Sequence, residues 1–534
     1  MTATLNEPDL ASTVTRKDRR IIDRRERDRS VVWGIVGAAV LAAVCLTASI
    51  TLPGAPVGAI LVVFSLAYIF RGVLFSWQGL LNIFLLVVLF IPAKRVAIAI
   101  PLPFDLEVYR VVLVGLILAV VVSLLVDPKF RMREMKFQWL IGLMLGTMIL
   151  SLGANAAPLT EQALAGGSIG AILNFVLLSS PFFLVRLLLS SVKVVDGVIA
   201  LLSVGGAIIG IGAAIERLTH TNIFLLIGSI PGFQRLTEAS EDFRSGGARA
   251  FGSAQHPIAL GVLLCMLIPL AIYQARHAEW PQKNKKLFWI VCAALMGVGV
   301  ICTVSRTAYL VLALMALIAI IWRPGFLYKL VIIGAPMAAL ASLAAPQAVL
   351  SSLRSFLDPK SLIESQYASA GWTGSGRLAD LGPSLTEAAR TPWFGTGPGS
   401  RIVTGPEANA FILDNQMLGT LLEGGIVGSI AAILLLVVPT ITLLVFARRQ
   451  VAGSKYRDLG LALAASIAGY FLSLFFFDGF GFLQTLMMFF VLLALGAWLL
   501  TESPTAVADR ALADRRKFMR EIARRENAGA RVGS

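Results

Sequence analysis

The fold is decided by the stretch from Gly374 to Gly428, in which a long polar segment ends and an apolar run begins. It contains, in order, Gly374-Ser-Gly-Arg377, Thr391-Pro-Trp-Phe-Gly-Thr-Gly-Pro-Gly399, Asp414-Asn415 and Glu423-Gly-Gly-Ile-Val-Gly428. Glycines at this density permit positive φ angles and a close approach of backbone amides to a ligand. Arg377, Arg390 and Arg401 add guanidinium groups that suit phosphate or pyrophosphate. The alternative is an ordinary Gly/Pro surface loop whose arginines are solvated.

The composition around this stretch is that of an integral membrane protein. Hydrophobic residues make up 57% and charged residues 14% of the 534 positions, and the mean hydropathy is +0.81. A water-soluble globule of this length would not have such values, and long apolar runs are the expected signal of membrane-spanning helices. We predict an all-α polytopic membrane protein with about 14 transmembrane helices and one large extracytoplasmic loop between late spans.

The apolar runs define the predicted topology. They lie at about residues 31–50, 56–70, 79–92, 109–126, 138–153, 168–188, 196–215, 256–274, 287–304, 307–322, 330–347, 421–447, 459–477 and 480–500. We divide the chain into a polar tail (1–30), a transmembrane domain (31–502) and a basic tail (503–534). Basic loops such as 129–136, 276–286 and 448–457 fall on one side, which the positive-inside rule assigns to the cytoplasm together with both termini.

The net charge of +15 agrees with this location. Its concentration in tails and in loops on one side indicates topology and lipid headgroups rather than nucleic acid. Lys94, Arg95 and Arg110 are exceptions, because they fall on the opposite side. The four cysteines lie inside apolar runs and the three histidines lack zinc spacing, so we expect neither a disulfide framework nor a metal site.

Two polar segments, at about residues 216–255 and 346–415, face outward under this topology. Both contain arginines together with acids. The positive-inside rule gives no reason to place so many arginines outside, but an anionic ligand at the outer leaflet would supply one. Loop salt bridges, worth about 0–1 kcal/mol each, are the alternative.

The order of the motifs resembles the O-antigen ligase and O-antigen polymerase superfamily of polytopic membrane glycosyltransferases. Members carry a Gly-Arg segment, a Pro-x-x-Gly-x-Gly-Pro-Gly turn, His-Asn or Asp-Asn, and Leu-x-Glu-x-Gly-x-x-Gly, and all four occur here in that order. Arg249–Pro257 and Ser305-Arg306-Thr307 also resemble the family, so the motifs cover roughly residues 245–430. Ligases generally have His-Asn where this chain has Asp414-Asn415, and the aspartate form is more similar to the polymerases.

The resemblance implies transfer of a glycan from a polyprenyl-pyrophosphate donor to an acceptor sugar hydroxyl, without a metal or other cofactor and with inversion at the anomeric carbon. Negative charge develops on the departing pyrophosphate, and arginines can stabilise it because they stay protonated. We predict a membrane glycan polymerase at the outer face of the cytoplasmic (inner) membrane. Its partners would be the donor, the glycan acceptor, membrane lipids and polysaccharide-assembly proteins.

Three other functions remain open. One is an O-antigen-type ligase that uses a lipid or cell-wall acceptor. Another is a lipid-linked oligosaccharide flippase, which should line a central cavity with charges from many spans, whereas the predicted spans are almost free of deep charges. The third is a non-catalytic scaffold of an assembly complex, for which substitution of the outer arginines would be silent.

Asp414, Arg306 and Arg377 are the predicted catalytic residues. Asp414 precedes a span, where we expect partial burial and a role as base toward the acceptor hydroxyl; a helix N-cap is the alternative. Arg306 lies in a short hairpin between two apolar runs, which would hold it at headgroup level on the outer surface; a snorkelling arginine is the alternative. Arg377 is favoured by its flanking glycines and by the resemblance.

The predicted substrate-binding residues are Arg249, His256, Arg401, Asn415, Glu423 and Arg244. Arg401 directly follows the Gly-Pro-Gly turn, and His256 opens an apolar run with a proline behind it. A helix cap or a packing residue is the alternative for His256. Glu423 is a second candidate base, and in a glycine-rich apolar surrounding it should either be buried with a partner or line a wet cavity.

Overall fold

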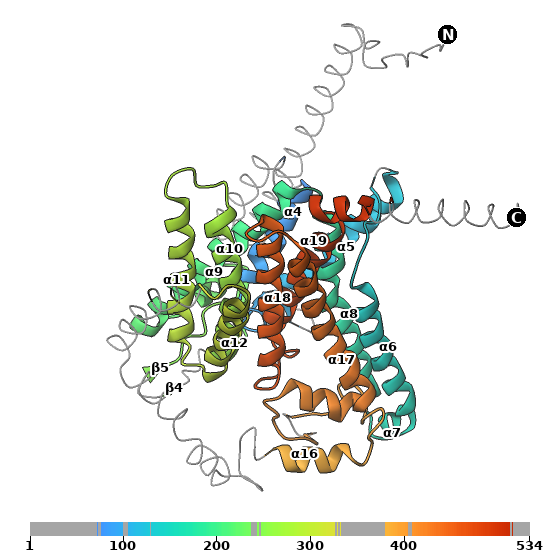
Figure 1. Ribbon diagram of the computed structural model, residues 1–534. Helices are drawn as coiled ribbons and strands as arrows, with labels where there is room; N and C mark the ends of the chain where they lie inside the picture. The colour runs from blue at the N-terminus through green and yellow to red at the C-terminus, as the bar shows by residue number, and fades with distance from the viewer. Residues whose placement is uncertain are drawn as a thin grey trace, which may run out of the picture. The chain divides into compact units, whose positions relative to one another are not determined.

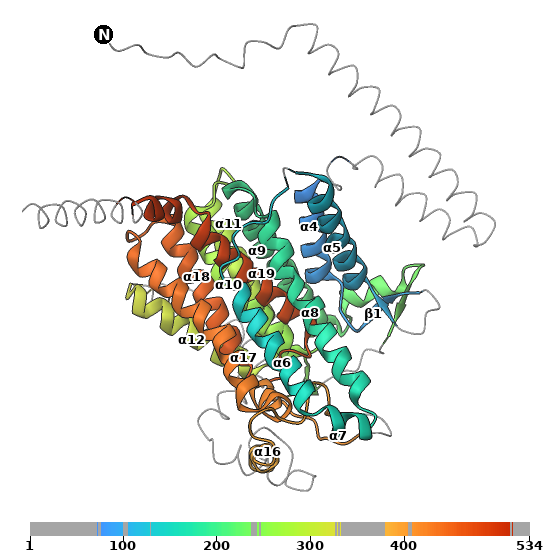
Figure 2. The same cartoon turned by 90° about the vertical axis from the view of Figure 1, so that its right-hand side faces the viewer.

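The computed structural model describes residues 76–99, 105–128, 130–236, 243–244, 247–325, 380–403 and 408–512, with isolated positions at 72, 328, 332 and 515. The chain divides into two units, residues 1–79 and 80–534. The second unit contains the described parts of the predicted functional segments (Figures 1 and 2).

Long helices dominate the described residues. They are α4 (Trp77–Phe90), α5 (Val108–Val126), α6 (Gln138–Ala154), α8 (Ala165–Leu188), α9 (Val192–Thr219), α10 (Pro257–His277), α11 (Lys285–Cys302), α12 (Arg306–Trp322), α17 (Gln416–Arg449), α18 (Lys455–Ser473) and α19 (Leu483–Thr501). Each overlaps a predicted span. Seven helices in the described part are long and apolar enough to cross a membrane, and α4, α6 and α12 are shorter apolar helices. The protein is therefore a multi-pass, mostly helical membrane protein.

The predicted number of about 14 spans is not established by these helices. The predicted spans at 31–50 and 56–70 lie outside the described residues, as does nearly all of the span at 330–347. Most of the predicted large outer loop at 346–415 also lies outside them. Its described end contains a short helix, α16 (Leu381–Ala388), and the glycine-rich turn that follows.

The mostly helical architecture fits the all-α prediction, and a few strands of two or three residues join the loops. Strand β1 (Val96–Ile98) pairs antiparallel with β2 (Leu106–Glu107) and with β3 (Phe233–Arg235) in the order β2-β1-β3. Strands β4 (Phe243–Arg244) and β5 (Gly247–Ala248) form a separate antiparallel pair. The three-stranded sheet ties the predicted outer segment 216–255 to the loop that follows α4.

A buried polar network holds the same two loops together. The Glu216 carboxylate, at the end of α9, accepts hydrogen bonds from the amides of Phe251 (3.1 Å) and Gly252 (2.7 Å) and from the Asn222 side chain (3.0 Å). The guanidinium of Arg95 lies 4.3 Å from the centre of the Phe251 ring. Burial lowers the pKa of Arg95, and the charge of Glu216 acts in the opposite direction. One of the exceptions to the positive-inside rule is thus a structural residue.

The core lies around α10 and α19. All residues of α19 except Leu500 are buried, and α19 packs against α8, α10 and α18. A helix that is apolar on every side is stable where other helices surround it. Helices α9 and α11 approach closely at glycines, because a Cβ at Gly299 would lie 2.8 Å from the Cα of Gly210, as is common in membrane helix pairs.

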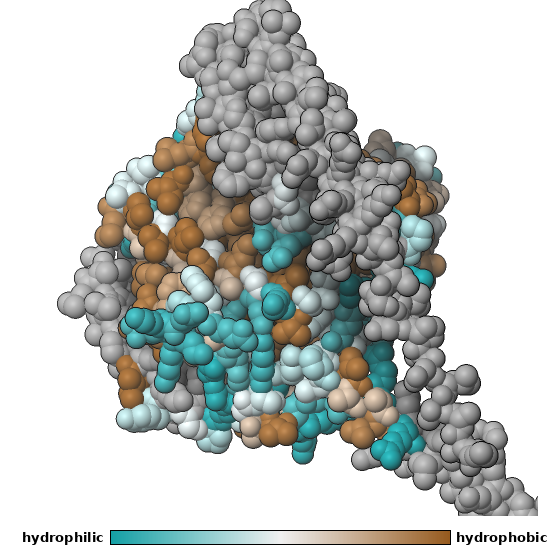
Figure 3. Space-filling view, turned by 90° about the horizontal axis from the view of Figure 1, so that it is seen from above, coloured by the Kyte–Doolittle hydropathy of each residue, from teal (hydrophilic) through white to brown (hydrophobic). Residues whose placement is uncertain are grey.

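The loops fall at two ends of these helices. Among the described residues, the basic end comprises 127–128, 130–136, 189–191, 278–284, 323–325, 450–454 and 502–512. The site end comprises 91–99, 105–107, 155–164, 220–236, 243–244, 247–256, 303–305, 380–403, 408–415 and 474–482. In Figure 1 the α10–α11 loop is at the top, and α7 (Ala156–Glu161) and α16 are at the bottom. Seen from above, hydrophilic side chains gather on the face of the basic end, with hydrophobic ones beside them (Figure 3).

Ion pairs link several elements at the basic end. Arg186, which is fully buried, pairs with Glu502 at 2.8 Å, and Arg133 pairs with the same carboxylate at 2.6 Å. Arg510 pairs with Glu134 at 2.9 Å. The separation of the loops agrees with the predicted parity of the spans; that the basic end faces the cytoplasm stays a prediction.

Candidate functional site

Helix α17 is broken near its start at Gly425. The φ of +64° and ψ of −162° at Gly425 are not helical, so backbone groups on both sides of the break lack their usual partners within the helix. A positive φ of this kind favours glycine. The break therefore gives the Glu423-Gly-Gly motif a local structural role.

The glycine-rich turn supplies the missing partners. The amides of Thr396 and Gly397 donate to the carbonyls of Leu422 (2.9 Å) and Glu423 (3.0 Å). In the other direction, the amides of Ile426 and Val427 donate to the carbonyls of Pro392 (2.8 Å) and Trp393 (3.2 Å). The two glycine motifs form one interlocked unit, which we call the turn–helix lock (residues 391–399 with 422–427).

The lock requires glycine at the contact. Gly395 has a φ of +64°, and a Cβ there would lie 2.5 Å from the carbonyl oxygen of Leu422. Ser151 of α6 lies within hydrogen-bond distance of the carbonyls of Phe394 (2.6 Å) and Glu423 (2.8 Å). These contacts correct the expectation that the turn amides approach a ligand, because the amides of Thr396 and Gly397 bind α17 instead.

Glu423 meets both descriptions offered for it from the sequence. Its carboxylate accepts a hydrogen bond from the Gly399 amide at 3.0 Å, and the residue also lines a cavity. An acid of α17, the helix against which the turn packs, thus binds the amide of the last glycine of the turn.

The cavity has a volume of about 570 Å³ and lies beside the turn–helix lock. Its walls come from α6, α8, the segments 398–403 and 412–415, the first turns of α17, and the loop between α18 and α19. Met144, Phe175 and Leu486 form apolar parts of the wall, and Asn174 and Gln255 are polar. A concave site with apolar walls and a few convergent polar groups is the usual form of a ligand site.

Five charged side chains line this cavity within the described part of the chain: Lys94, Arg401, Asp414, Glu423 and Asp478. The Lys94 ammonium donates to the carbonyl of Gly481 at 3.2 Å. The predicted surplus of arginines is not found in this wall, because Arg401 is the sole arginine among the described lining residues. Acids outnumber cations there.

Arg401 is held at the cavity by the loop that carries it. One terminal nitrogen donates to the carbonyl of Phe411 at 3.1 Å, and the guanidinium lies 5.4 Å from the centre of the Phe411 ring. Its Nε is buried and has no hydrogen-bond partner among the described residues. An unsatisfied buried donor of a cation is costly, and the protein contacts described here leave this hydrogen-bonding capacity of Arg401 unused.

Asp414 and Asn415 differ in role: one lines the cavity and the other caps a helix. Asn415 is the N-cap of α17, and its side chain accepts from the Leu418 amide at 3.0 Å. Asp414 is exposed and lines the cavity, which corrects the expected partial burial. The cap is therefore provided by the asparagine, and the carboxylate of Asp414 is left at the cavity wall.

Arg249, His256 and Arg306 also belong to the site end but are not among the residues that line the cavity. Arg249 is buried, and its Nε donates to the carbonyl of Thr303 at 3.0 Å. His256 caps α10, with Nδ1 accepting from the Ile258 amide at 3.1 Å, as the alternative interpretation predicts. Its ring lies 5.7 Å from that of Phe482, which belongs to the cavity wall.

The hairpin that carries Arg306 differs from the prediction. Thr303, Val304 and Ser305 are buried, so this turn is packed inside the protein rather than exposed on an outer surface. Arg306 is partly buried as the first residue of α12. Of the other predicted residues, Arg377 lies outside the described residues, and only the backbone of Arg244, in β4, is described.

Lys94 and Asp478 belong to the cavity but were not predicted. Each had a signal in the sequence: Lys94 breaks the positive-inside rule, and Asp478 is the only charged residue between Asp458 and Glu502. Asp478 is exposed at the cavity wall. Desolvation raises its pKa and the charge of Asp414 adds to this, whereas the Gly481 amide, Lys94 and Arg401 act to lower it.

Within the described residues, no three or more His, Cys, Asp or Glu side chains are grouped so as to hold a metal ion. Metal-independent transfer stays a prediction.

Comparison with protein-family models gives one result for this chain. Residues 291–433 match the family described as O-antigen ligase. The predicted resemblance to the O-antigen ligase superfamily is confirmed. The matched segment contains the turn–helix lock, Arg401 and Asp414, whereas Lys94 and Asp478 lie outside it. No curated protein matches the chain. The match supports a membrane glycan enzyme of the O-antigen ligase or polymerase type.

Proposed function

We propose that this O-antigen ligase-type protein is a membrane glycan polymerase. It transfers a polyprenyl-pyrophosphate-linked glycan to a hydroxyl of an acceptor sugar, at the outer face of the cytoplasmic membrane. The observation that carries the proposal is the cavity of about 570 Å³, whose wall includes Arg401, Asp414 and Glu423 from the family-matched segment. It supports a ligand site built on the same motifs that mark the family.

The cations of the wall suit the donor. Arg401 has a buried Nε without a partner among the described residues, and Lys94 brings a second positive charge to the same cavity. In the transfer, the bond between the anomeric carbon and the phosphate oxygen breaks, and the negative charge moves onto the leaving pyrophosphate. Fixed cations near that oxygen stabilise the transition state more than the ground state. Arg377 is proposed to add to them.

The acids of the wall suit the acceptor. The acceptor oxygen forms the new bond to the anomeric carbon, and its proton passes to a carboxylate. Asp414 remains the proposed base, because it lines the cavity and Asn415 provides the helix cap. Asp478 is the second candidate, and Glu423 is the least suited because its carboxylate accepts the Gly399 amide.

Ligation to a lipid or cell-wall acceptor is the second candidate function. The description of the matched family as O-antigen ligase favours it, whereas the Asp414-Asn415 form favours the polymerase. The two functions share donor chemistry and differ in the acceptor, so the size distribution of the product separates them.

The test is reconstitution of the purified protein with a polyprenyl-pyrophosphate-linked glycan. We expect Arg401→Gln and Asp414→Asn each to lower the rate of product formation about 100-fold, the usual effect of removing one transition-state donor or one general base. Arg306→Ala and Arg377→Ala test the other two predicted catalytic residues. A ladder of repeat-unit multiples on a gel identifies a polymerase, and a single transfer to an added lipid acceptor identifies a ligase.

Arg390→Gln is the matched control, because Arg390 is an exposed arginine of the same loop and is not among the cavity residues. Its rate should equal that of the wild type. Unchanged turnover in Arg401→Gln, Asp414→Asn, Arg306→Ala and Arg377→Ala would contradict the proposed site. Unchanged turnover together with movement of the lipid-linked glycan across the bilayer would indicate a flippase.

A further inference from the structure

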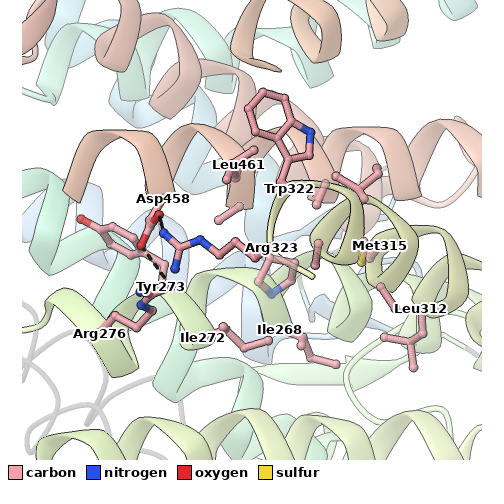
Figure 4. Close-up of a pocket in the computed structure, with 16 residues that line it drawn as sticks. Ile268, Ile272, Tyr273, Arg276, Leu312, Met315, Trp322, Arg323, Asp458 and Leu461 are labelled. Atoms are coloured by element: carbon pink, nitrogen blue, oxygen red, sulfur yellow. Dashed lines mark hydrogen bonds and ion pairs between the residues drawn. The ribbon is translucent and has the colours of Figure 1, made fainter. Parts of the chain in front are cut away.

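A second hollow lies at the basic end, away from the cavity described above. It has a volume of about 250 Å³ and is formed by α10, α12 and α18. Most of its wall is apolar, with Ile268, Ile272, Leu312, Met315 and Leu461 as the larger side chains. We call it the α10–α12–α18 groove (Figure 4).

Small side chains create the space for this groove. Ala316 and Ala319 on α12 and Ala462 and Ala465 on α18 line it. Larger residues at these positions would let the two helices fill the gap between them. The groove is open on one side, since Ile272 in its wall is 37% exposed.

Charged residues gather at one end of the groove. The Asp458 carboxylate pairs with Arg323, with His277 at 2.7 Å and with Arg276 at 3.5 Å. Figure 4 shows Arg276, Arg323 and Asp458 together at one end, with Leu312 and Met315 at the other. Two permanently charged arginines share one carboxylate, so the group has a net positive charge whatever the state of His277.

A third arginine adds to this charge. The guanidinium of Arg457 lies 5.9 Å from the centre of the Trp322 ring, and Trp322 is part of the groove wall. The Nε of Arg457 is buried and has no hydrogen-bond partner within the described residues. Arg276 is 44% exposed at its side chain, so an incoming anion can reach the cluster.

We propose that the α10–α12–α18 groove binds one anionic diacyl phospholipid from the leaflet at the basic end. An acyl chain lies along the apolar wall, and the phosphate contacts Arg276 and Arg323. Charge complementarity selects the anionic headgroup, because the excess positive charge lies where the groove ends. The apolar wall selects a lipid over a free phosphate, since it continues along three helices away from the charges. This site is separate from the proposed donor cavity, which lies at the opposite end of the helices.

The test is native mass spectrometry of the purified full-length protein, titrated with phosphatidylglycerol and, separately, with phosphatidylcholine of the same acyl chains. We expect the first bound phosphatidylglycerol to be retained more tightly than phosphatidylcholine. Arg276→Gln and Arg323→Gln should each weaken it about fivefold, as expected for one cation near a membrane surface. Ala319→Phe should remove the preference by filling the apolar part of the groove.

Arg449→Gln serves as the matched control, because Arg449 is an exposed arginine at the same end and lies outside the groove; it should leave the preference unchanged. Should Arg323→Gln fail to fold, Arg276→Gln still decides the question, since its side chain is nearly half exposed. Equal retention of the two lipids would overturn the proposal, as would a preference unaffected by both Arg276→Gln and Ala319→Phe. Loss of the preference in millimolar phosphate with no effect of Ala319→Phe would indicate a phosphate site instead.

Discussion

Asp478 shows how single charged residues tune the cavity. It faces Lys94 and Arg401, which stabilise its ionised form, but it also faces Asp414, which opposes it. Desolvation is the larger effect, so its pKa lies above that of an ordinary aspartate. The proximity of two acids whose surroundings differ is a usual arrangement where a proton is accepted.

The raised pKa of Asp478 predicts a pH-dependent stability. Below the ordinary aspartate range the carboxyl is protonated in the folded and the unfolded chain, and it contributes nothing. Between the ordinary aspartate pKa and the raised pKa of the folded chain, the unfolded chain has lost a proton that the folded chain retains. The free energy of unfolding therefore falls as the pH rises across this window. Asp478→Asn removes this term, and its thermal midpoint should therefore exceed that of the wild type at neutral pH and approach it at low pH.

Thermal unfolding in detergent across this pH range measures the effect. Glu279→Gln, which replaces an exposed acid at the basic end, is the control and should show no such trend. A wild-type midpoint that stays equal to or above that of Asp478→Asn at every pH would contradict the prediction.

At the scale of elements, the turn–helix lock joins a non-helical turn to a helix that is broken at Gly425. The break at Gly425 leaves carbonyls and amides in α17 that the turn 391–399 satisfies, with Ser151 of α6 as a further donor to the Glu423 carbonyl. In a membrane protein such groups cannot be left without partners in an apolar surrounding. The turn also places the Gly399 amide against the Glu423 carboxylate. Because Arg401 follows two residues later, this contact fixes where Arg401 begins.

Two neighbouring glycines test the lock. At Gly425 a Cβ would meet the backbone of Trp393 and Phe394, and φ is +64°, whereas at Gly424 no atom lies within 4 Å of the added Cβ. We expect Gly425→Ala to destabilise the protein by at least about 1–3 kcal/mol, the cost of a strained backbone conformation. Gly424→Ala should leave stability nearly unchanged.

The measurement is the thermal midpoint of each purified variant, with solvent accessibility of a cysteine placed at Arg390 as a second readout of the turn. Gly425→Ala should lower the midpoint and increase the labelling rate. Equal midpoints for the two alanine variants would show that the lock contributes little to stability.

At the scale of the whole molecule, charge separates the two ends of the helices. Arg133, Arg186, Arg276, Arg323 and Arg510 all lie at the basic end and pair with acids there. Figure 3 looks onto this end. The cavity lies at the other end, so the orientation of the protein decides which compartment supplies its glycan substrates.

The predicted orientation is tested by cysteine labelling in intact cells. Arg390→Cys, at the site end, should react with a membrane-impermeant maleimide added outside. Lys283→Cys, in the exposed α10–α11 loop, should react only after the membrane is permeabilised. The wild type gives the background from its native cysteines. The reverse pattern would place the cavity in the cytoplasm and contradict a reaction at the outer face.

The sequence by itself determined the helices and the family. The eleven predicted spans that fall on described residues each coincide with a helix within a few residues, because an apolar run in lipid must satisfy its own backbone hydrogen bonds. Asp414, Asn415 and parts of the glycine motifs line one wall of the cavity. These motifs were recognisable in the sequence because turns and helix caps depend on neighbouring residues.

Only the tertiary structure decided which charges share the cavity. Lys94 lines the same cavity as Arg401 and Asp478 although it is far from both along the chain. Arg249 and His256, by contrast, match a family motif but form structural contacts outside the cavity wall. The physical reason is that helix packing, and not spacing along the chain, sets which loops meet at one end. Hydropathy and motif order contain no information about that packing.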